Sequence, residues 1–117
     1  MPARVLIVDD HQGFRAAAHA LLGAEGFVVV GEAGDGPAAV EAVARLRPDV
    51  VLLDVQLPGI DGFGVAELLS EGDDGPVVVL ISSREAAVYG ARIARSSAAG
   101  FLAKGALSGA TLRQLLV

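Results

Sequence analysis

The feature that most limits the fold of this chain lies at residues 50–54, where four consecutive apolar residues end in Asp54. The segment that follows, residues 55–62, contains the turn-forming residues Pro, Gly and Asp. An apolar run of this length beside turn residues is typical of a strand buried on both faces of a parallel sheet. Asp54 would then stand at the carboxyl end of that strand, where open α/β sheets bind their ligands. The alternative is that Asp54 only begins a turn.

Four further apolar segments alternate with helical patterns along the chain. Strands are expected at residues 4–8, 27–32, 77–81 and 99–103. Helices are expected at residues 14–25, between residues 37 and 48, at residues 64–71 and 85–95, and after Ser108, which is expected to cap the last one. Strands and helices in alternation indicate right-handed crossovers and a parallel sheet covered on both faces. A three-layer α/β domain is therefore predicted.

The helix expected at residues 85–95 has the weakest pattern. Its inward side would consist mainly of Ala87, Ala91 and Ala94, and Gly90 interrupts it at a cost of roughly 1 kcal/mol relative to alanine. Tyr89 would either join a surface for a partner or remain an ordinary half-exposed tyrosine. Such loose packing suits an element that changes position, and it equally fits a helix that is simply poorly packed.

The composition excludes several classes of function. A net charge of −5 and an aromatic content of 4% argue against an electrostatic or stacking grip on nucleic acid. The absence of cysteine removes disulfides and thiol chemistry. No apolar run of about 18 residues and no signal-peptide pattern are present. One domain over residues 1–117, a cytoplasmic location and no membrane partner are expected.

Polar side chains follow four of the five expected strands: Asp9 and Asp10, Asp54, Ser82, and Lys104. Since the carboxyl ends of parallel strands lie at one edge of a sheet, these groups are expected in one cleft. Carboxylates 4 Å apart repel by about 1 kcal/mol in water and by about 4 kcal/mol at a surface-like dielectric constant, so a cation is expected among them. Oxygen ligands alone favour Mg²⁺.

This set of groups fits phosphoryl transfer. Asp54 could act as a nucleophile on phosphorus and form an aspartyl phosphate. Lys104 and the Ser82 hydroxyl could contact further phosphoryl oxygens, so that positioning and charge compensation are supplied by the protein.

The same residues resemble the receiver domain of two-component response regulators over the whole chain. Asp10, Asp54, Ser82 and Lys104 are separated by 44, 28 and 22 residues, and residues 57–62 (LPGIDG) follow the central aspartate. Gly105 after the lysine, with residues 9–11 (DDH) and 100–104 (GFLAK), is similar to the subgroup joined to a helix-turn-helix DNA-binding domain.

This resemblance implies a flavodoxin-like fold with strand order 2-1-3-4-5, and a magnesium-dependent transfer from a sensor histidine kinase to Asp54. Asp10 and Asp54 would bind Mg²⁺ directly, Asp9 would bind it through water, and the backbone carbonyl of Gln56 would complete the protein ligands. Phe101 would be the aromatic residue that turns inward when Ser82 moves toward the phosphoryl group. Because phenylalanine has no hydroxyl group, an outward state held by a phenolic hydrogen bond is not expected at that position.

The resemblance also implies that Gln56 and Arg84 occupy two variable positions beside the acceptor, where their side chains would tune the lifetime of the aspartyl phosphate. The alternative is that both are solvated loop residues. His11 and His19 are expected to be surface residues.

Phosphorylation would switch the face formed by residues 85–95, 99–103 and 108–116. The outcome would be transcriptional control through an effector domain outside this chain, with homodimerisation as a possible step. Activity would be limited to self-phosphorylation and self-dephosphorylation.

Other functions remain open. A stand-alone receiver would act through protein contacts or as a phosphorelay intermediate. An aspartate-nucleophile phosphohydrolase usually carries Asp-x-Asp after its first strand, where this chain has adjacent aspartates. A flavin binder of the same topology needs a Ser/Thr/Gly loop there, and Asp9 and Asp10 would repel its phosphate.

Overall fold

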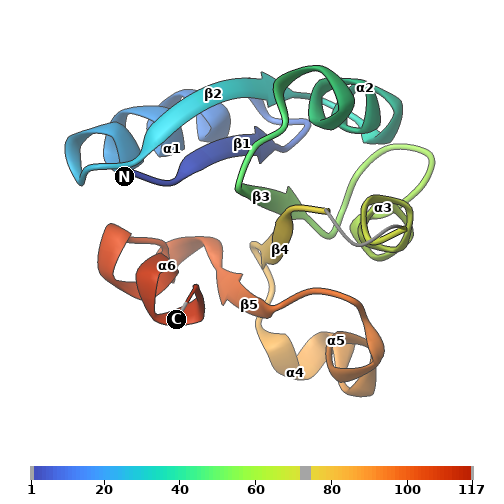
Figure 1. Cartoon of the computed structure of the whole chain (residues 1–117). Coiled ribbons are helices and arrows are strands. Elements are labelled where there is room, and N and C mark those ends of the chain that lie inside the picture. Colours follow the sequence, from blue (N-terminus) through green and yellow to red (C-terminus); the bar gives the residue numbers. More distant parts are fainter. Residues whose placement is uncertain (1, 72–74, 117) are drawn as a thin grey trace.

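The computed structural model describes residues 2–71 and 75–116 and contains one five-stranded parallel sheet in the order β2-β1-β3-β4-β5 (Figure 1). The strands are β1 (Arg4–Val8), β2 (Val28–Ala33), β3 (Val50–Asp54), β4 (Val77–Ser82) and β5 (Gly100–Ala103). The helices are α1 (Gln12–Ala24), α2 (Gly36–Leu46), α3 (Gly62–Leu69), α4 (Ala86–Tyr89), α5 (Ala91–Arg95) and α6 (Gly109–Leu115), with a 3-10 turn, η1, at Lys104–Ala106. The predicted α/β class and strand order are confirmed.

Helices cover both faces of the sheet and enclose two separate cores. Because successive side chains of a strand point to opposite faces, Leu6 and Val8 join one core and Val5 and Ile7 join the other. The first core lies under α2 and α3, with partly buried residues of α4 and α5 packed against it. The second lies under α1 and α6. The result is the predicted three-layer arrangement.

The strand β3 occupies the centre of the sheet, and all five of its residues are buried. Its neighbours β1 and β4 pair with it in parallel register, with Val5 opposite Val50 and Val50 opposite Val77. Burial of each large apolar side chain here stabilises the fold by about 1.5–3 kcal/mol, so a continuous apolar run is what a central parallel strand requires.

Short polar residues determine where several helices begin. Asp35 caps α2 by accepting a hydrogen bond from the Ala38 backbone over 2.8 Å. Asp61 accepts one from the Gly64 backbone over 3.0 Å, and for this reason α3 begins at Gly62, two residues before the predicted start. Ser108 caps α6, as the sequence predicts.

The helix predicted at residues 85–95 is divided in two. Gly90 adopts a positive φ of 55°, which ends α4 and starts α5 in a new direction. The prediction that Ala87, Ala91 and Ala94 face inward is wrong, because all three are exposed. Tyr89 and Ile93 pack against the core instead. The break at Gly90 interrupts the helical period, and the two larger side chains remove more apolar surface from water than three alanines do.

Candidate functional site

Three buried polar or charged side chains stand at the carboxyl edge of the sheet within the described ranges 2–71 and 75–116. Asp9 directly follows β1, Asp54 ends β3 and Ser82 ends β4, with exposed fractions of 0%, 2% and 0%. Parallel pairing in register brings these ends to the same edge. Asp54 is therefore the last residue of a buried strand, and the polar residues Asp9 and Ser82 stand at the ends of the two neighbouring strands.

Lys104 follows β5 and extends over the two buried carboxylates. Its Nζ atom lies 2.6 Å from Oδ2 of Asp9 and 3.6 Å from Oδ2 of Asp54. The ammonium group also lies 4.5 Å from the centre of the Phe14 ring, whose face attracts a cation. One ammonium thus neutralises part of the charge of two carboxylates.

The environment of Asp54 holds its pKa at about 6, above the ordinary value of 3.8. Burial is the largest cause, and the charge of Asp9 adds to it. The Gln56 backbone N–H, which donates to Oδ1 of Asp54 over 3.2 Å, and the Lys104 ammonium act in the opposite direction. At neutral pH the carboxyl is mostly ionised, as a nucleophile requires.

The carboxylates of Asp9, Asp10 and Asp54 and the imidazole of His11 each offer one ligand atom within 4.8 Å of the others. Oδ2 of Asp9 is buried and accepts no hydrogen bond of suitable geometry from any described residue, although the Lys104 ammonium lies close to it. A buried carboxylate oxygen that lies among other carboxylates fits a hard divalent cation. These residues could therefore hold Mg²⁺.

Both histidines are exposed, as predicted. His11 nevertheless contacts the acidic group, since its Nδ1 lies 3.0 Å from Oδ1 of Asp10 and 3.2 Å from Oδ1 of Asp9. His19 pairs with Glu32 at 3.0 Å and does not belong to the group formed by Asp9, Asp10, His11 and Asp54.

The Ser82 hydroxyl has two hydrogen-bond partners. Its Oγ lies 2.6 Å from Oη of Tyr89 and accepts a hydrogen bond from the Arg84 backbone over 3.0 Å. The Tyr89 ring lies 5.8 Å from that of Phe101, which is half-buried. No sequence signal identified Tyr89 as a partner of Ser82; seven residues and a turn separate them.

Gln56 and Arg84 flank the site, and both are exposed. Their backbone N–H groups bind Oδ1 of Asp54 and Oγ of Ser82. The roles predicted for the Gln56 carbonyl and for both side chains stay predictions.

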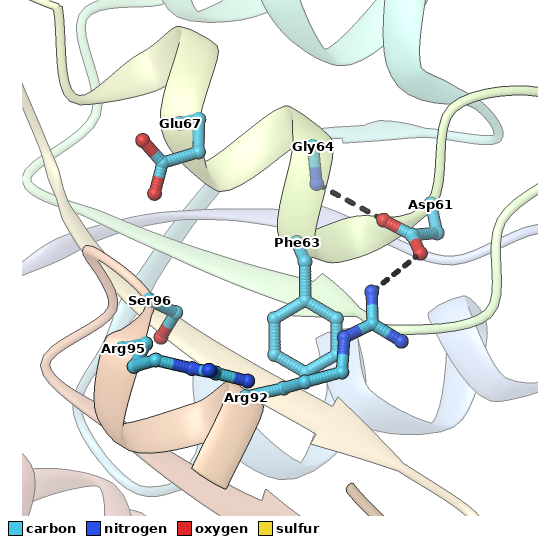
Figure 2. Close-up of a pocket in the computed structure, with 7 residues that line it drawn as sticks. All are labelled: Asp61, Phe63, Gly64, Glu67, Arg92, Arg95 and Ser96. Carbon is cyan, nitrogen blue, oxygen red and sulfur yellow. Dashed lines mark hydrogen bonds and ion pairs between the residues drawn. The ribbon is translucent and has the colours of Figure 1, made fainter.

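A groove of about 450 Å³ lies between α3 and α5, and neither Asp9, Asp10 nor Asp54 lines it (Figure 2). Arg92 crosses it, 4.3 Å from the centre of the Phe63 ring and 3.1 Å from Oδ2 of Asp61. The residues that line the groove are Asp61, Phe63, Gly64, Glu67, Arg92, Arg95 and Ser96.

The sequence profile of the response regulator receiver domain matches residues 5–116. This chain belongs to that family. It is 33% identical over 99 residues to the DNA-binding transcriptional activator EvgA of Escherichia coli, covering 85% of this chain and 48% of that protein. It is 48% identical over 83 residues to a protein-glutamate methylesterase/protein-glutamine glutaminase of Myxococcus xanthus, covering 70% of this chain and 24% of that protein.

The fold is also similar to solved receiver domains. That of the putative response regulator NarL from Mycobacterium tuberculosis superimposes with a TM-score of 0.86 at 35% identity, covering 98% of this chain and 97% of that one. The domain is thus a receiver of two-component response regulators, related to transcription regulators. The matched part covers less than half of the length of either curated relative. In the described ranges, none of the helices has the length and hydrophobicity of a membrane-spanning segment.

Proposed function

We propose that this receiver is a phosphorylation-dependent switch in which Asp54 accepts a phosphoryl group from the phosphohistidine of a sensor kinase. A carboxylate oxygen of Asp54 would attack phosphorus, and the imidazole of the kinase would leave as the phosphorus–nitrogen bond breaks. The observation that carries the proposal is the burial of Asp54 beside Asp9, with the Lys104 ammonium contacting both.

The acidic group supports a requirement for Mg²⁺. Asp10 and Asp54 would bind the ion directly, Asp9 through water, and the Gln56 backbone carbonyl would be the remaining protein ligand. When bound, the cation supplies positive charge that neutralises phosphoryl oxygens. The Asp10 side chain is half-exposed, whereas Oδ2 of Asp9 is buried. A cation bound among these residues would therefore be open to solvent on one side and enclosed by the protein on the other.

The other predicted site residues would respond to the new group. Lys104 would pair with a phosphoryl oxygen, because its ammonium already lies within 4 Å of Asp54. Ser82 would donate a hydrogen bond to another oxygen, and Phe101 would turn inward. Gln56 and Arg84 would set the lifetime of the phosphoryl group, and substitutions there should change the dephosphorylation rate without preventing phosphorylation. An unchanged rate in both variants would leave them as solvated loop residues.

We infer that the output is transcriptional control by a DNA-binding domain outside this chain, because the relatives include a transcriptional activator. On phosphorylation, the face formed by α4, α5, β5 and α6 would change its affinity for a partner. A second copy of this domain is one such partner. The methylesterase relative makes an enzymatic output domain an alternative. A further alternative is that the protein is a stand-alone receiver, or a phosphorelay intermediate, in the cytoplasm. The domain itself would catalyse only its own phosphorylation and dephosphorylation.

Intact mass spectrometry after incubation with acetyl phosphate tests the proposal. Wild type should gain one phosphoryl group in the presence of Mg²⁺ and none after chelation, and Asp54→Asn should gain none. Glu41→Gln, on the exposed side of α2, is the matched control and should behave as wild type. An adduct that persists in Asp54→Asn, or no adduct in wild type, would contradict the proposal. Turnover of phosphomonoesters would favour a phosphohydrolase instead.

A further inference from the structure

The hydroxyl of Ser82 is held by a tyrosine from the helix that follows β4. Oγ of Ser82 is buried, lies 2.6 Å from Oη of Tyr89 and accepts a bond from the Arg84 backbone. Within residues 2–71 and 75–116 it forms no hydrogen bond with Asp54 or Lys104. The interactions of this hydroxyl are therefore directed to α4 and the preceding loop, and away from the acidic group.

The position of Tyr89 is in turn fixed by two aromatic rings. The ring of Phe63 in α3 lies 5.7 Å away at 66°, and that of Phe101 in β5 lies 5.8 Å away at 56°. Edge-to-face and tilted pairs at these distances are favourable. These two ring contacts hold the phenol beside Ser82. Because the rings of Phe101 and Tyr89 pack together, a rotation of Phe101 would displace Tyr89.

Tyr89 is also one of the side chains that attach α4 and α5 to the body of the domain. Neither helix contains a buried residue, and neither has a side-chain hydrogen bond at its N-cap. Tyr89 and Ile93 are their residues that pack against the core. A displacement of Tyr89 would thus loosen or move both helices.

We propose that Tyr89 is a positioning residue, which holds Ser82 while Asp54 is unphosphorylated and releases it, together with α4 and α5, on phosphorylation. The inference rests on the proposed role of Asp54. A phosphoryl group offers the Ser82 hydroxyl a charged acceptor, and such hydrogen bonds are roughly twice as strong as neutral ones. The Ser82 hydroxyl then exchanges its hydrogen bond with Oη of Tyr89 for one to the phosphoryl group. Oη of Tyr89 thereby loses its bond to Ser82.

The chain allows a direct test, because Tyr89 is its single tyrosine and it contains no tryptophan. Tyrosine fluorescence therefore reports on this residue alone. With acetyl phosphate and Mg²⁺, emission should change in step with the adduct seen by intact mass, and it should stay constant in Asp54→Asn. Ser82→Ala should shift the emission before any phosphorylation. Ser83→Ala, an exposed neighbouring serine, is the matched control and should match wild type.

A second variant separates the phenol oxygen from the ring. Tyr89→Phe keeps the aromatic contacts and removes the bond to Ser82, so it should be phosphorylated by acetyl phosphate about 2- to 10-fold faster than wild type. A normal adduct with unchanged tyrosine emission, or a wild-type rate in Tyr89→Phe, would overturn the role of Tyr89 while leaving that of Asp54 intact. If wild type forms no adduct, the proposed function fails, and this inference fails with it.

Discussion

Asp54 and Asp9 lie side by side at the buried edge of the sheet, and within the described part of the chain Lys104 is the cation that contacts both. The pKa of Asp54, about 6 in the fold, exceeds its ordinary value of 3.8. Between these pH values the native state binds more protons than the unfolded chain, so stability falls as pH rises through this window. Above this window, the ionised Asp54 carboxylate lowers the free energy of unfolding by up to about 3 kcal/mol relative to a carboxylate of ordinary pKa. Such a destabilising residue is consistent with a role in the chemistry of the site.

Asp54→Asn should therefore stabilise the domain in magnesium-free buffer. At pH 7.5 we expect its free energy of unfolding to exceed that of wild type by about 1–3 kcal/mol, and at pH 4 the difference should nearly vanish. Urea denaturation at both pH values measures this. Glu41→Gln, at an exposed carboxylate, should show no such difference. Equal stabilities of Asp54→Asn and wild type at pH 7.5 would mean that the carboxylate is adequately compensated in the fold.

Magnesium should offset the repulsion among the carboxylates. If the ion binds the native state alone, a concentration ten times its dissociation constant stabilises wild type by about 1.4 kcal/mol. Thermal denaturation with and without Mg²⁺ should show this gain, and Asp9→Asn and Asp10→Asn should reduce it. A gain of the same size in both variants would place the ion elsewhere.

At the scale of elements, the turn from β3 into α3 depends on a close backbone approach. The N–H of Gly62 donates to the Val55 carbonyl over 2.8 Å. A Cβ atom at Gly62 would overlap the backbone carbonyl of Asp54 and come within 2.7 Å of Cα of Val55. The first residue of α3 therefore determines where the end of β3 lies, and with it the carboxylate of Asp54.

Gly62→Ala should thus destabilise the domain and disturb the site. We expect a loss of about 1–3 kcal/mol in the free energy of unfolding, because backbone atoms must move apart, and a lower rate of phosphorylation by acetyl phosphate. Gly13→Ala is the matched control, because the added Cβ in α1 would meet no described residue within 4 Å apart from its chain neighbours and the backbone of its own helix. It should gain up to about 1 kcal/mol from helix propensity. A Gly62→Ala protein as stable as wild type would show that the turn has room to relax.

At the scale of the whole molecule, the sheet joins two cores that do not otherwise merge. Leu52 faces the core under α1 and α6, and Leu53 faces the one under α2 and α3. Both side chains are fully buried. Since one strand contributes to both cores, loss of packing on one face weakens the strand that supports the other.

Leu52→Ala and Leu53→Ala should each lower the free energy of unfolding by about 2–5 kcal/mol. Hydrogen exchange should accelerate on both faces of the sheet in either variant, because the two cores unfold together. Val28→Ala, at a position 45% exposed on the edge strand, should cost less than about 1 kcal/mol. Faster exchange confined to the mutated face would instead indicate that the two cores open independently.

Much of this architecture follows from local sequence patterns. The apolar run at residues 50–54 predicted a strand buried on both faces, and all five residues of β3 are buried. The alternation of strands with helices predicted that the sheet is parallel. Once the strands are parallel, their polar ends must share an edge, so the location of Asp9, Asp54, Ser82 and Lys104 at one edge of the sheet was predictable from the sequence. These features depend on residue type and periodicity, which the sequence contains in full.

Other properties depend on how distant segments pack, and only the tertiary structure decided them. The division of residues 85–95 at Gly90, the inward position of Tyr89 and its bond to Ser82 arise from competition among side chains for one core. The raised pKa of Asp54 arises from burial and from the distance to Asp9. Periodicity assigns a residue to a face, but the distance between two side chains on different elements is set by the packing of everything between them.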